Sequence, residues 1–152
     1  MNRAQDAEDA FGRMVDLGLT NGFLSVKFVF RPYSVEFWSD KAATGQYPVW
    51  LRQIALRSSA RSTCLLLIGH TSPSGPPAVN DALSEHRAEY VRNQLVQRAP
   101  ALRTRTEAEG RGAREPIVGT GKDDWTDLLD RRVEFEPRPC GAFESGPPPG
   151  RT

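Results

Sequence analysis

The sequence predicts a single α/β domain, with a mixed sheet of about four strands and helices packed mainly on one face. Three observations predict it. Strand-like apolar patterns are interleaved with helical ones in the order helix, strand, helix, strand, helix, strand, strand. A length of 152 residues suits one hydrophobic core. The segment CLLLI, residues 64–68, is apolar on both faces, as in a central strand covered on both sides.

The first half of the chain contains two predicted helices and one strand. Residues 7–19 form a short amphipathic helix that Asn21-Gly22 stops. Its apolar residues at helical spacing are Ala10, Phe11, Met14 and Leu17. Residues 23–30, FLSVKFVF, form a strand that Pro32 ends. Its inward side chains are Leu24, Val26, Phe28 and Phe30.

An irregular connection over residues 31–46 precedes the second helix, at residues 47–58, which has Pro48 in its first turn. Its inward side chains are Leu51, Ile54, Ala55 and Ser58. The order strand, helix, strand predicts a crossover unit whose two strands run parallel.

The second half begins with a strong helix over residues 80–96, for which Asn80 suits the N-cap. Residues 102–110 read as a half-buried strand with Leu102, Thr104, Thr106 and Ala108 on one face. A polar loop follows over residues 110–127, with one helical turn near 124–129. Residues 131–136 form the last strand, with Val133 and Phe135 inward.

Three segments result from this pattern. Residues 1–21 form a helical lead and residues 22–136 the domain. Residues 137–152, rich in proline and glycine, form a tail with too few apolar residues to offset the entropy of ordering, so we expect disorder.

Charge and hydropathy restrict the function classes. The formal net charge of +1 disfavours nucleic acid or an anionic membrane as partner. No apolar run approaches the roughly 18 residues that span a bilayer, and residues 1–11 do not resemble a signal peptide. The chain is therefore expected not to insert into a membrane, and is either cytoplasmic or a piece of a larger exported protein.

The chain has two cysteines, Cys64 and Cys140. They are two free thiols, or they form one disulfide bridge if Cys140 folds back beside residue 64 in an oxidising compartment.

A charged residue interrupts the apolar face of the helix at residues 80–96. Arg87 lies midway along the arc formed by Leu83, Tyr90, Val91 and Leu95. Because a buried guanidinium needs a partner, Arg87 is paired inside the protein, reaches solvent through its long stem, or receives an anion.

The position of this helix favours the third alternative. It follows the C-terminal end of a central strand, where ligands of sheets with parallel strands usually bind. The loop adds polar side chains there: His70, Thr71, Ser72, Ser74 and Asn80. A guanidinium holds a carboxylate through two parallel hydrogen bonds, so a carboxylate is the expected ligand.

Four blocks of residues share the spacing of a known family. They are Gly69-His70-Thr71; Asn80, Leu83-Ser84, Arg87-Ala88, Val91 and Leu95; Gly110-Arg111-Gly112; and Arg131-Arg132-Val133-Glu134. With this pattern, about residues 23–135 resemble the OmpA C-terminal-like peptidoglycan-binding domains, found also in peptidoglycan-associated lipoprotein and in flagellar motor stator proteins. The resemblance implies a two-layer β-α-β-α-β-β sandwich.

The resemblance also implies a function, which is non-catalytic binding of the diaminopimelate end of a peptidoglycan stem peptide. In that site Arg87 receives the carboxylate, Asn80 and the loop residues Thr71, Ser72 and Ser74 add hydrogen bonds, and Arg131 lies close by. No cofactor or metal is implied. The location implied is the periplasm, as part of an outer-membrane or envelope-anchored protein whose signal or anchor is not in this chain, with other envelope proteins as further partners.

Two residues depart from the family pattern. Ser72 stands where the family has the aspartate that takes the ligand's ammonium group. Replacing that charge-assisted bond with a neutral one is expected to lower affinity about tenfold to a hundredfold. Asp130 replaces an asparagine before Arg131; it either pairs with Arg131 or Arg132, or partly replaces the missing acid.

Other functions fit the sequence less well. Serine hydrolysis is suggested by a crowding of possible triad residues, but the Gly-x-Ser-x-Gly elbow is missing. The crowded residues are His70, Ser72, Ser74, Asp81, Ser84 and His86. Gly119-Thr120-Gly121-Lys122 lacks the first glycine of a phosphate-binding loop, since Pro116 occupies that position. The strongest alternative is a domain of this fold that has lost cell-wall binding and serves as a protein-interaction or scaffold module.

Overall fold

The computed structural model describes residues 3–26, 28, 30–31, 34–35, 37, 45–61, 63–71, 76–113 and 132–140. The described elements are α1 (Arg3–Asn21), β1 (Leu24–Val26), α3 (Tyr47–Ser59), β2 (Cys64–Gly69), α4 (Pro77–Arg98), the 3-10 helix η1 (Pro100–Thr104), β3 (Thr106–Gly110) and β4 (Val133–Arg138). The helical turn predicted near residues 124–129 lies outside the described residues.

The four strands form one mixed sheet in the order β1-β4-β2-β3. β2 and β3 are parallel neighbours, while β4 is antiparallel to both β1 and β2. β1 and β2 therefore run in the same direction, as the crossover rule predicts, with β4 inserted between them. The predicted α/β architecture with a mixed four-stranded sheet is confirmed.

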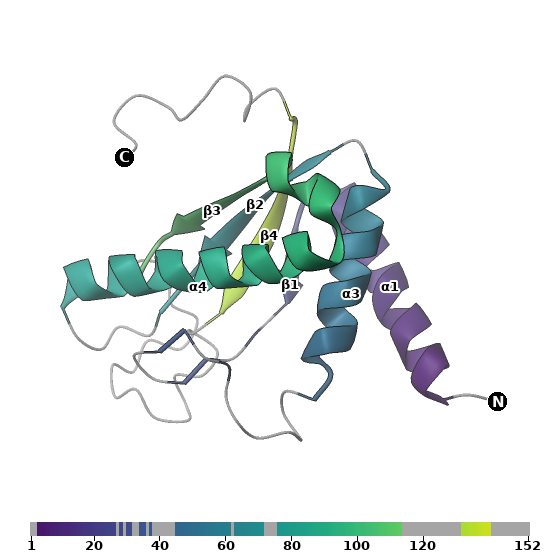
Figure 1. The fold of residues 1–152 in the computed structure, drawn as a ribbon, viewed down its shortest axis with the longest axis horizontal. Coiled ribbons are helices and arrows are strands. Elements are labelled where there is room, and N and C mark those ends of the chain that lie inside the picture. The colour runs from purple at the N-terminus through teal and green to yellow at the C-terminus, as the bar shows by residue number, and fades with distance from the viewer. Residues whose placement is uncertain are drawn as a thin grey trace.

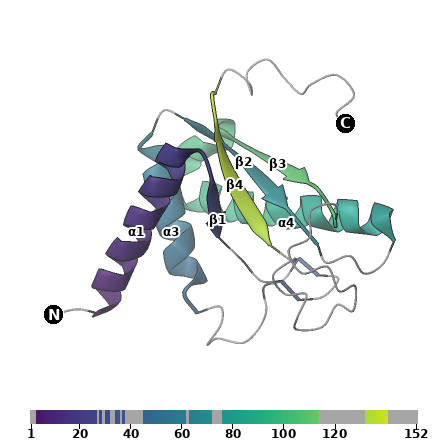
Figure 2. The same ribbon diagram turned by 180° about the vertical axis from the view of Figure 1, so that it is seen from behind.

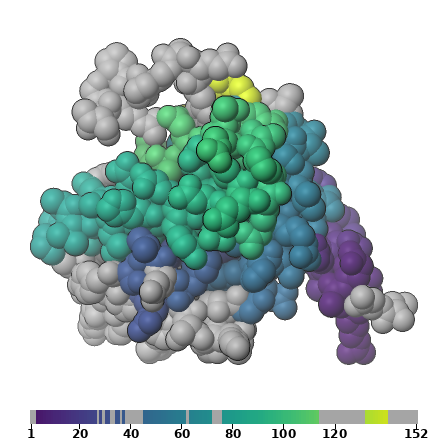
Figure 3. Space-filling model, viewed as in Figure 1, coloured from purple at the N-terminus to yellow at the C-terminus, as the bar shows by residue number. Residues whose placement is uncertain are grey.

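The helices lie on one face of this sheet. Figure 1 shows α3 and α4 in front of the strands, and Figure 2 shows the opposite face with none of the three helices over it. α1 stands at the β1 edge, against α3. In the space-filling view, α4 and α3 form a continuous surface on the helical side (Figure 3). The arrangement is a two-layer sandwich.

The core lies between the sheet and its helices. Alternate strand residues point into it, including Leu65 and Leu67 of β2 and Val133 and Phe135 of β4. The helices contribute Leu51, Ile54 and Ala55 from α3 and Ala88, Val91 and Leu95 from α4. Aromatic rings pack around Phe28, which contacts Phe37, Tyr47 and Trp50. Phe28 and Phe30 point inward as predicted, although β1 itself ends at Val26.

The face that α1 buries differs from the predicted one. Val15 and Leu19 are buried, whereas Met14 is 46% and Leu17 62% exposed, and Ala10 is exposed as well. Two apolar stripes compete on this helix, and polar contacts with α3 decide between them. Glu8 and Asp16, which flank the Val15 stripe, pair with arginines of α3. The predicted stripe therefore faces outward, apart from Phe11, which packs against the core.

Two element boundaries also differ from the prediction. α4 begins at Pro77 rather than at Asn80, because proline is favoured in the first helical turn. Asn80 thus lies within the helix and is not its N-cap. Residues 100–104 form η1 rather than the start of a strand; Pro100 opens it and Leu102 is still buried.

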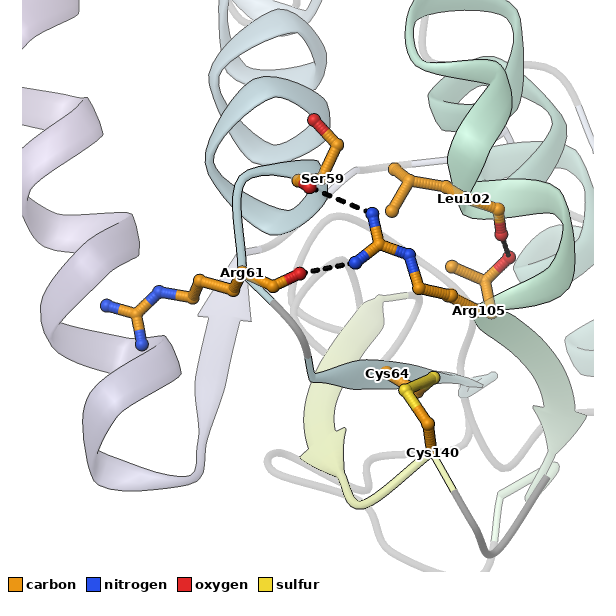
Figure 4. The surroundings of a disulfide bond; sticks show 7 residues. Ser59, Arg61, Cys64, Leu102, Arg105 and Cys140 are labelled. Carbon is orange, nitrogen blue, oxygen red and sulfur yellow. Dashed lines mark hydrogen bonds between the residues drawn. A yellow bond between two sulfur atoms is a disulfide. The ribbon is translucent and has the colours of Figure 1, made fainter. Parts of the chain in front are cut away.

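The end of β4 is fixed by a disulfide between Cys64 and Cys140, with Cα atoms 5.0 Å apart. β4 continues through Pro137 and Arg138, two residues past the predicted boundary, and Arg138 pairs with Cys64 across the sheet. This brings Cys140 beside the start of β2 (Figure 4). The sequence left open whether the two cysteines are free thiols or form a disulfide; the structure shows the disulfide.

The neighbourhood of the disulfide also holds the C-terminal end of α3. The Arg105 guanidinium donates to the carbonyl oxygens of Ser59, at 2.9 Å, and of Arg61 (Figure 4). The last carbonyls of a helix lack partners within the helix and attract positive charge. Arg105 therefore ties α3 to the beginning of β3.

Candidate functional site

The candidate site lies where β2 ends and α4 begins. His70 and Thr71 follow β2 directly, and both are buried. The His70 N–H donates to the carbonyl of Arg132 at 2.8 Å, and the Thr71 N–H donates to that of Gly112 at 2.8 Å. These bonds hold the segment after β2 between the start of β4 and the residues that follow β3.

Glycines allow α4 to approach this end of the sheet closely. A Cβ at Gly69 would lie 1.9 Å from the Ser84 carbonyl oxygen, and one at Gly110 would lie 2.5 Å from the Ser84 hydroxyl. Gly112 has a φ of +54°, which glycine adopts without strain, and its N–H donates to the Ser84 hydroxyl at 2.9 Å. Ser84 in turn donates to the Asp81 carbonyl. The first turns of α4 are thereby fixed on β2 and β3.

Arg87 lies one turn further along α4 and is fully buried, at 0% exposure. Its Nε donates to the Ser34 carbonyl at 2.8 Å and its Nη2 to the Arg31 carbonyl at 2.9 Å. The guanidinium also lies over the Phe30 ring, 5.0 Å from the ring centre, in a cation–π contact. Arg87 therefore does not reach solvent through its stem, and backbone groups that precede α3 orient its guanidinium.

Three of the predicted site residues lie within the described part of the chain: Thr71, Asn80 and Arg87. Asn80 and Arg87 lie on the buried face of α4, with Ser84, which was not among the predicted site residues, between them. Ser84 is connected through Gly112 to Thr71. The Thr71 hydroxyl is buried, and no described residue forms a hydrogen bond with it. The other predicted residues, Ser72, Ser74 and Arg131, lie outside the described residues.

An ion pair supports the segment after β2 from the side of β4. The Arg132 guanidinium pairs with the Glu134 carboxylate, and both side chains are largely buried. His70 Nε2 lies 3.4 Å from the same carboxylate. The buried His70 ring is thus held against the Arg132–Glu134 ion pair.

Sequence reasoning missed the contributions of Phe30, Arg31 and Ser34 to the Arg87 site. Two of the three act through backbone carbonyls, which any residue supplies, so no side-chain pattern could have revealed them. The contact of Ser84 with this part of the sheet could have been predicted, because the Gly-x-Gly at residues 110–112 indicates that another backbone segment approaches closely.

Two kinds of feature are absent from the residues that the structure describes. Among the described residues, no group of three or more His, Cys, Asp and Glu side chains is arranged to hold a metal ion. Within the same residues, no helix has the length and apolar character needed to cross a bilayer.

The fold and the motifs on it define the class of protein. The domain has a mixed β1-β4-β2-β3 sheet with helices on one face and a buried arginine on the helix after β2. The sequence of residues 49–126, half of the chain, matches the model of the OmpA family. The chain belongs to the OmpA family.

Solved structures agree with this assignment. The chain is similar to the peptidoglycan-associated lipoprotein from Burkholderia pseudomallei, with 29% identity over 75% of this chain and 89% of that one, and a TM-score of 0.59. The fold is shared with the periplasmic domain of Helicobacter pylori MotB, with 18% identity over 81% of this chain and 75% of that one, and a TM-score of 0.57. It is also shared with the cell wall anchor of the T6SS from Pseudomonas aeruginosa, with 20% identity over 82% and 94% of the two chains and a TM-score of 0.56. Comparison with the curated proteins gives no match.

Proposed function

We propose that this domain binds bacterial peptidoglycan without catalysing a reaction, and that it holds the diaminopimelate end of the stem peptide. The observation that carries the proposal is the burial of Arg87 on α4, beside the end of β2, in a chain of the OmpA family. The similar protein from Burkholderia pseudomallei is itself described as peptidoglycan-associated, and the Pseudomonas aeruginosa neighbour as a cell wall anchor.

Arg87 is proposed to receive the ligand carboxylate. Its guanidinium now donates to the Arg31 and Ser34 carbonyls, which are neutral acceptors. A carboxylate accepts a stronger, charge-assisted pair of hydrogen bonds in the same planar geometry. Binding therefore exchanges at least one of the two carbonyls for a carboxylate oxygen and shifts the chain at residues 31 and 34.

Neighbouring polar groups are proposed to complete the site. Thr71 is 3% exposed, and its buried hydroxyl has no hydrogen-bond partner among the described residues, so a bond to the ligand would offset the cost of its burial. Asn80 is buried one helical turn before Ser84 and can offer both a donor and an acceptor. Ser72, Ser74 and Arg131 are proposed to contribute from the adjacent segments, as the resemblance implies.

The neutral Ser72 is proposed to make this site weaker than that of family members with aspartate. The ligand's ammonium group then lacks a charge-assisted partner at this position. The expected loss of affinity is about tenfold to a hundredfold.

The place of action proposed is the periplasm, where the domain anchors an envelope protein to the cell wall. The disulfide between Cys64 and Cys140 supports this, because such bridges persist in oxidising compartments. Other envelope proteins are proposed as further partners.

A second candidate function is a protein-interaction or scaffold module without cell-wall binding. One observation favours it: the Arg87 guanidinium already has two carbonyl acceptors and an aromatic face inside the domain. An arginine of this kind can be structural.

The experiment that separates the two is an NMR titration of the ¹⁵N-labelled domain with a stem peptide that contains meso-diaminopimelate. The matched control ligand contains lysine at that position, which keeps the ammonium group but lacks the carboxylate. Peptidoglycan binding requires saturable shifts at Thr71, Asn80 and Arg87 with the first peptide and much weaker ones with the second.

A gain-of-function variant makes the result independent of folding defects. Ser72→Asp is expected to raise the affinity of the domain for the diaminopimelate peptide about tenfold to a hundredfold. If the native domain shows no shifts at millimolar peptide and only Ser72→Asp responds, the interaction-only function is the correct one.

A further inference from the structure

A guanidinium without a carboxylate partner among the described residues is fixed on the C-terminal half of α4. Arg92 is half-buried. Its Nε donates to the Thr106 hydroxyl at 2.9 Å and to the Thr106 carbonyl at 3.2 Å, and its Nη2 donates to the Arg103 carbonyl at 2.7 Å. These bonds tie α4 to η1 and to the start of β3, and they hold the guanidinium plane in one orientation.

Part of the hydrogen-bonding capacity of Arg92 is not used by these contacts. A guanidinium has more N–H donors than the one on Nε and one on Nη2. Within the described part of the chain, the N–H groups of Nη1 have no acceptor, and no ion pair involves Arg92. Because the end of a guanidinium presents two parallel donors in a fixed plane, Arg92 is oriented to receive an anion.

Arg92 borders a cavity of about 300 Å³, which we call the Arg92 cavity. Two successive turns of α4 and one residue of η1 line it: Arg92, Asn93, Val96, Gln97 and Arg103. Figure 1 shows η1 directly after the end of α4, at the end of the sheet where β3 begins. None of the described residues that line this cavity is acidic.

Arg103 brings a second positive charge to the Arg92 cavity. Its side chain is exposed and has no hydrogen bond or ion pair with a described residue, while its carbonyl holds Arg92 in place. The long, flexible stem of an arginine lets the guanidinium turn toward an anion that Arg92 already holds. The two arginines therefore act on the same position, one as a fixed receptor and the other as a mobile clamp.

The total charge favours phosphate over carboxylate as the ligand group. A phosphate monoester carries about −1.5 to −2 charges near neutral pH and offers three strong acceptor oxygens. It can accept hydrogen bonds from Arg92 and Arg103 at once. A carboxylate has one negative charge and two oxygens, which a single guanidinium fork already satisfies.

Two carboxamides indicate what the rest of the ligand carries. Asn93 and Gln97 are exposed and stand at i and i+4 on α4, so their side chains are neighbours on the helix surface. Each offers both a donor and an acceptor. A hydroxyl group also donates and accepts, so a phosphate ester of a small molecule with several hydroxyls, such as a sugar, matches this lining.

An adjoining cavity limits the charge that the ligand can bear. It has a volume of about 420 Å³, shares Arg92 and Asn93 with the first, and is lined also by Glu89 and Glu107. A second anionic group that extended into it would approach the exposed carboxylate of Glu89, and like charges repel. One phosphate is therefore favoured over a diphosphate or a polyanion such as nucleic acid.

We propose that the Arg92 cavity binds the phosphate group of a sugar monophosphate. Arg92 and Arg103 hold the phosphate, and Asn93 and Gln97 bind the hydroxyl groups of the sugar. The site is separate from Arg87 and does not depend on the proposed peptidoglycan binding.

The test is an NMR titration of the whole ¹⁵N-labelled chain with glucose 6-phosphate. Glucose, gluconate and inorganic phosphate are the control ligands, which lack the phosphate, replace it with a carboxylate, or lack the sugar. The proposal requires saturable shifts concentrated on residues 92–97 and 103. It also requires at least tenfold weaker binding of glucose and of gluconate, and weaker binding of inorganic phosphate than of glucose 6-phosphate.

Matched protein variants test the charge and the specificity separately. Arg103→Gln removes an exposed charge and should weaken glucose 6-phosphate about tenfold. Arg98→Gln is its control, because Arg98 is also exposed but bonds only to Gln94 of its own helix and does not line the cavity. Asn93→Ala should weaken glucose 6-phosphate and leave inorganic phosphate unchanged. Thermal unfolding shows that each variant is folded.

A further ligand separates two sources of the sugar phosphate. Methyl glucoside 6-phosphate has a blocked anomeric oxygen, as a phosphorylated sugar within a polymer does. Binding equal to that of glucose 6-phosphate supports a site that accepts a phosphorylated polymer, and binding of the unblocked sugar alone supports a site for the free sugar phosphate.

Four results would overturn the proposal. Gluconate that binds as tightly as glucose 6-phosphate would exclude the preference for phosphate, and inorganic phosphate that binds equally well would reduce the site to an adventitious anion only. Equal losses in Arg98→Gln and Arg103→Gln would show attraction by the general surface charge. Shifts at Thr71, Asn80 and Arg87 in place of residues 92–97 would assign the ligand to the candidate site at the end of β2.

Discussion

Gly69 faces the carbonyl oxygen of Ser84 so closely that a Cβ at position 69 would lie 1.9 Å from that oxygen. This contact sets the distance between β2 and α4 at the place where the candidate site is built. The atom that a side chain would meet belongs to the backbone of a helix, which cannot rotate away.

Gly69→Ala is therefore expected to lower the free energy of unfolding by about 3 kcal/mol, since overpacking forces the helix off the sheet. Urea denaturation measures the change. Gly22→Asn is the control, because Gly22 has a φ of +89° that asparagine tolerates and no atom lies within 4 Å of its added Cβ. Equal stability of Gly69→Ala and the native chain would contradict the packing described here.

The disulfide gives a second prediction. It joins residues 76 positions apart, so in the chain-entropy description it stabilises the fold by about 4.5 kcal/mol. Reduction, or replacement of both Cys64 and Cys140 by alanine, should lower the midpoint of urea denaturation accordingly. The double alanine variant should show no further loss when reductant is added, and a native chain indifferent to reductant would refute the prediction.

Much of the fold could be predicted from the sequence, and the failures have local causes. The central strand CLLLI could be predicted because a short segment that is apolar on both faces fits the middle of a sheet. The helix after it could be predicted because its apolar residues form one long arc. The face of α1 was mispredicted because Met14 and Leu17 make as good a stripe as Val15 and Leu19. Only the pairing of Glu8 and Asp16 with α3, a contact between residues more than 40 positions apart, decides between them.

The candidate site was predictable in part for a similar reason. Arg87 could be singled out because a charge on an apolar arc is a conflict visible in sequence. The hydrogen-bond acceptors of Arg87 could not be predicted, since the Arg31 and Ser34 carbonyls come from an irregular segment whose sequence shows no periodicity. The start of α4 at Pro77 was missed because a proline that favours a first helical turn is also typical of the preceding loop.

The contact between α1 and α3 makes the stability depend on pH. Hydrogen bonds from Arg52 and Gln53 lower the pKa of the Glu8 carboxyl below its ordinary value of 4.5. A carboxyl whose pKa is lower in the folded than in the unfolded state contributes stability above its unfolded pKa and loses it as the pH falls through the folded value.

Glu8→Gln should therefore destabilise the domain at pH 7, and this difference should shrink as the pH is lowered from 7 to values well below 4.5. Thermal unfolding of both proteins across this range measures the effect. Glu85→Gln, which changes an exposed glutamate of α4, is the control and should follow the native curve. A destabilisation by Glu8→Gln that is the same at all pH values would exclude the ionic contribution of Glu8.

Substitutions of Arg87 distinguish a structural role of this residue from a role in ligand binding. Its two carbonyl acceptors belong to the backbone and stay in place when the side chain is changed, so Arg87→Met removes the guanidinium donor from both. The Arg31 carbonyl keeps the Ser34 N–H as a donor, at 3.2 Å, so the expected loss in the free energy of unfolding comes mainly from the Ser34 carbonyl and from the cation–π contact and is about 2 kcal/mol.

Arg87→Lys keeps the charge but not the planar pair of donors, so it should lose about half as much stability and still fold. If Arg87 also receives the ligand carboxylate, this lysine variant should bind the diaminopimelate peptide at least tenfold more weakly than the native chain. A lysine variant that binds as tightly as the native chain would limit Arg87 to holding the Arg31 and Ser34 carbonyls in place.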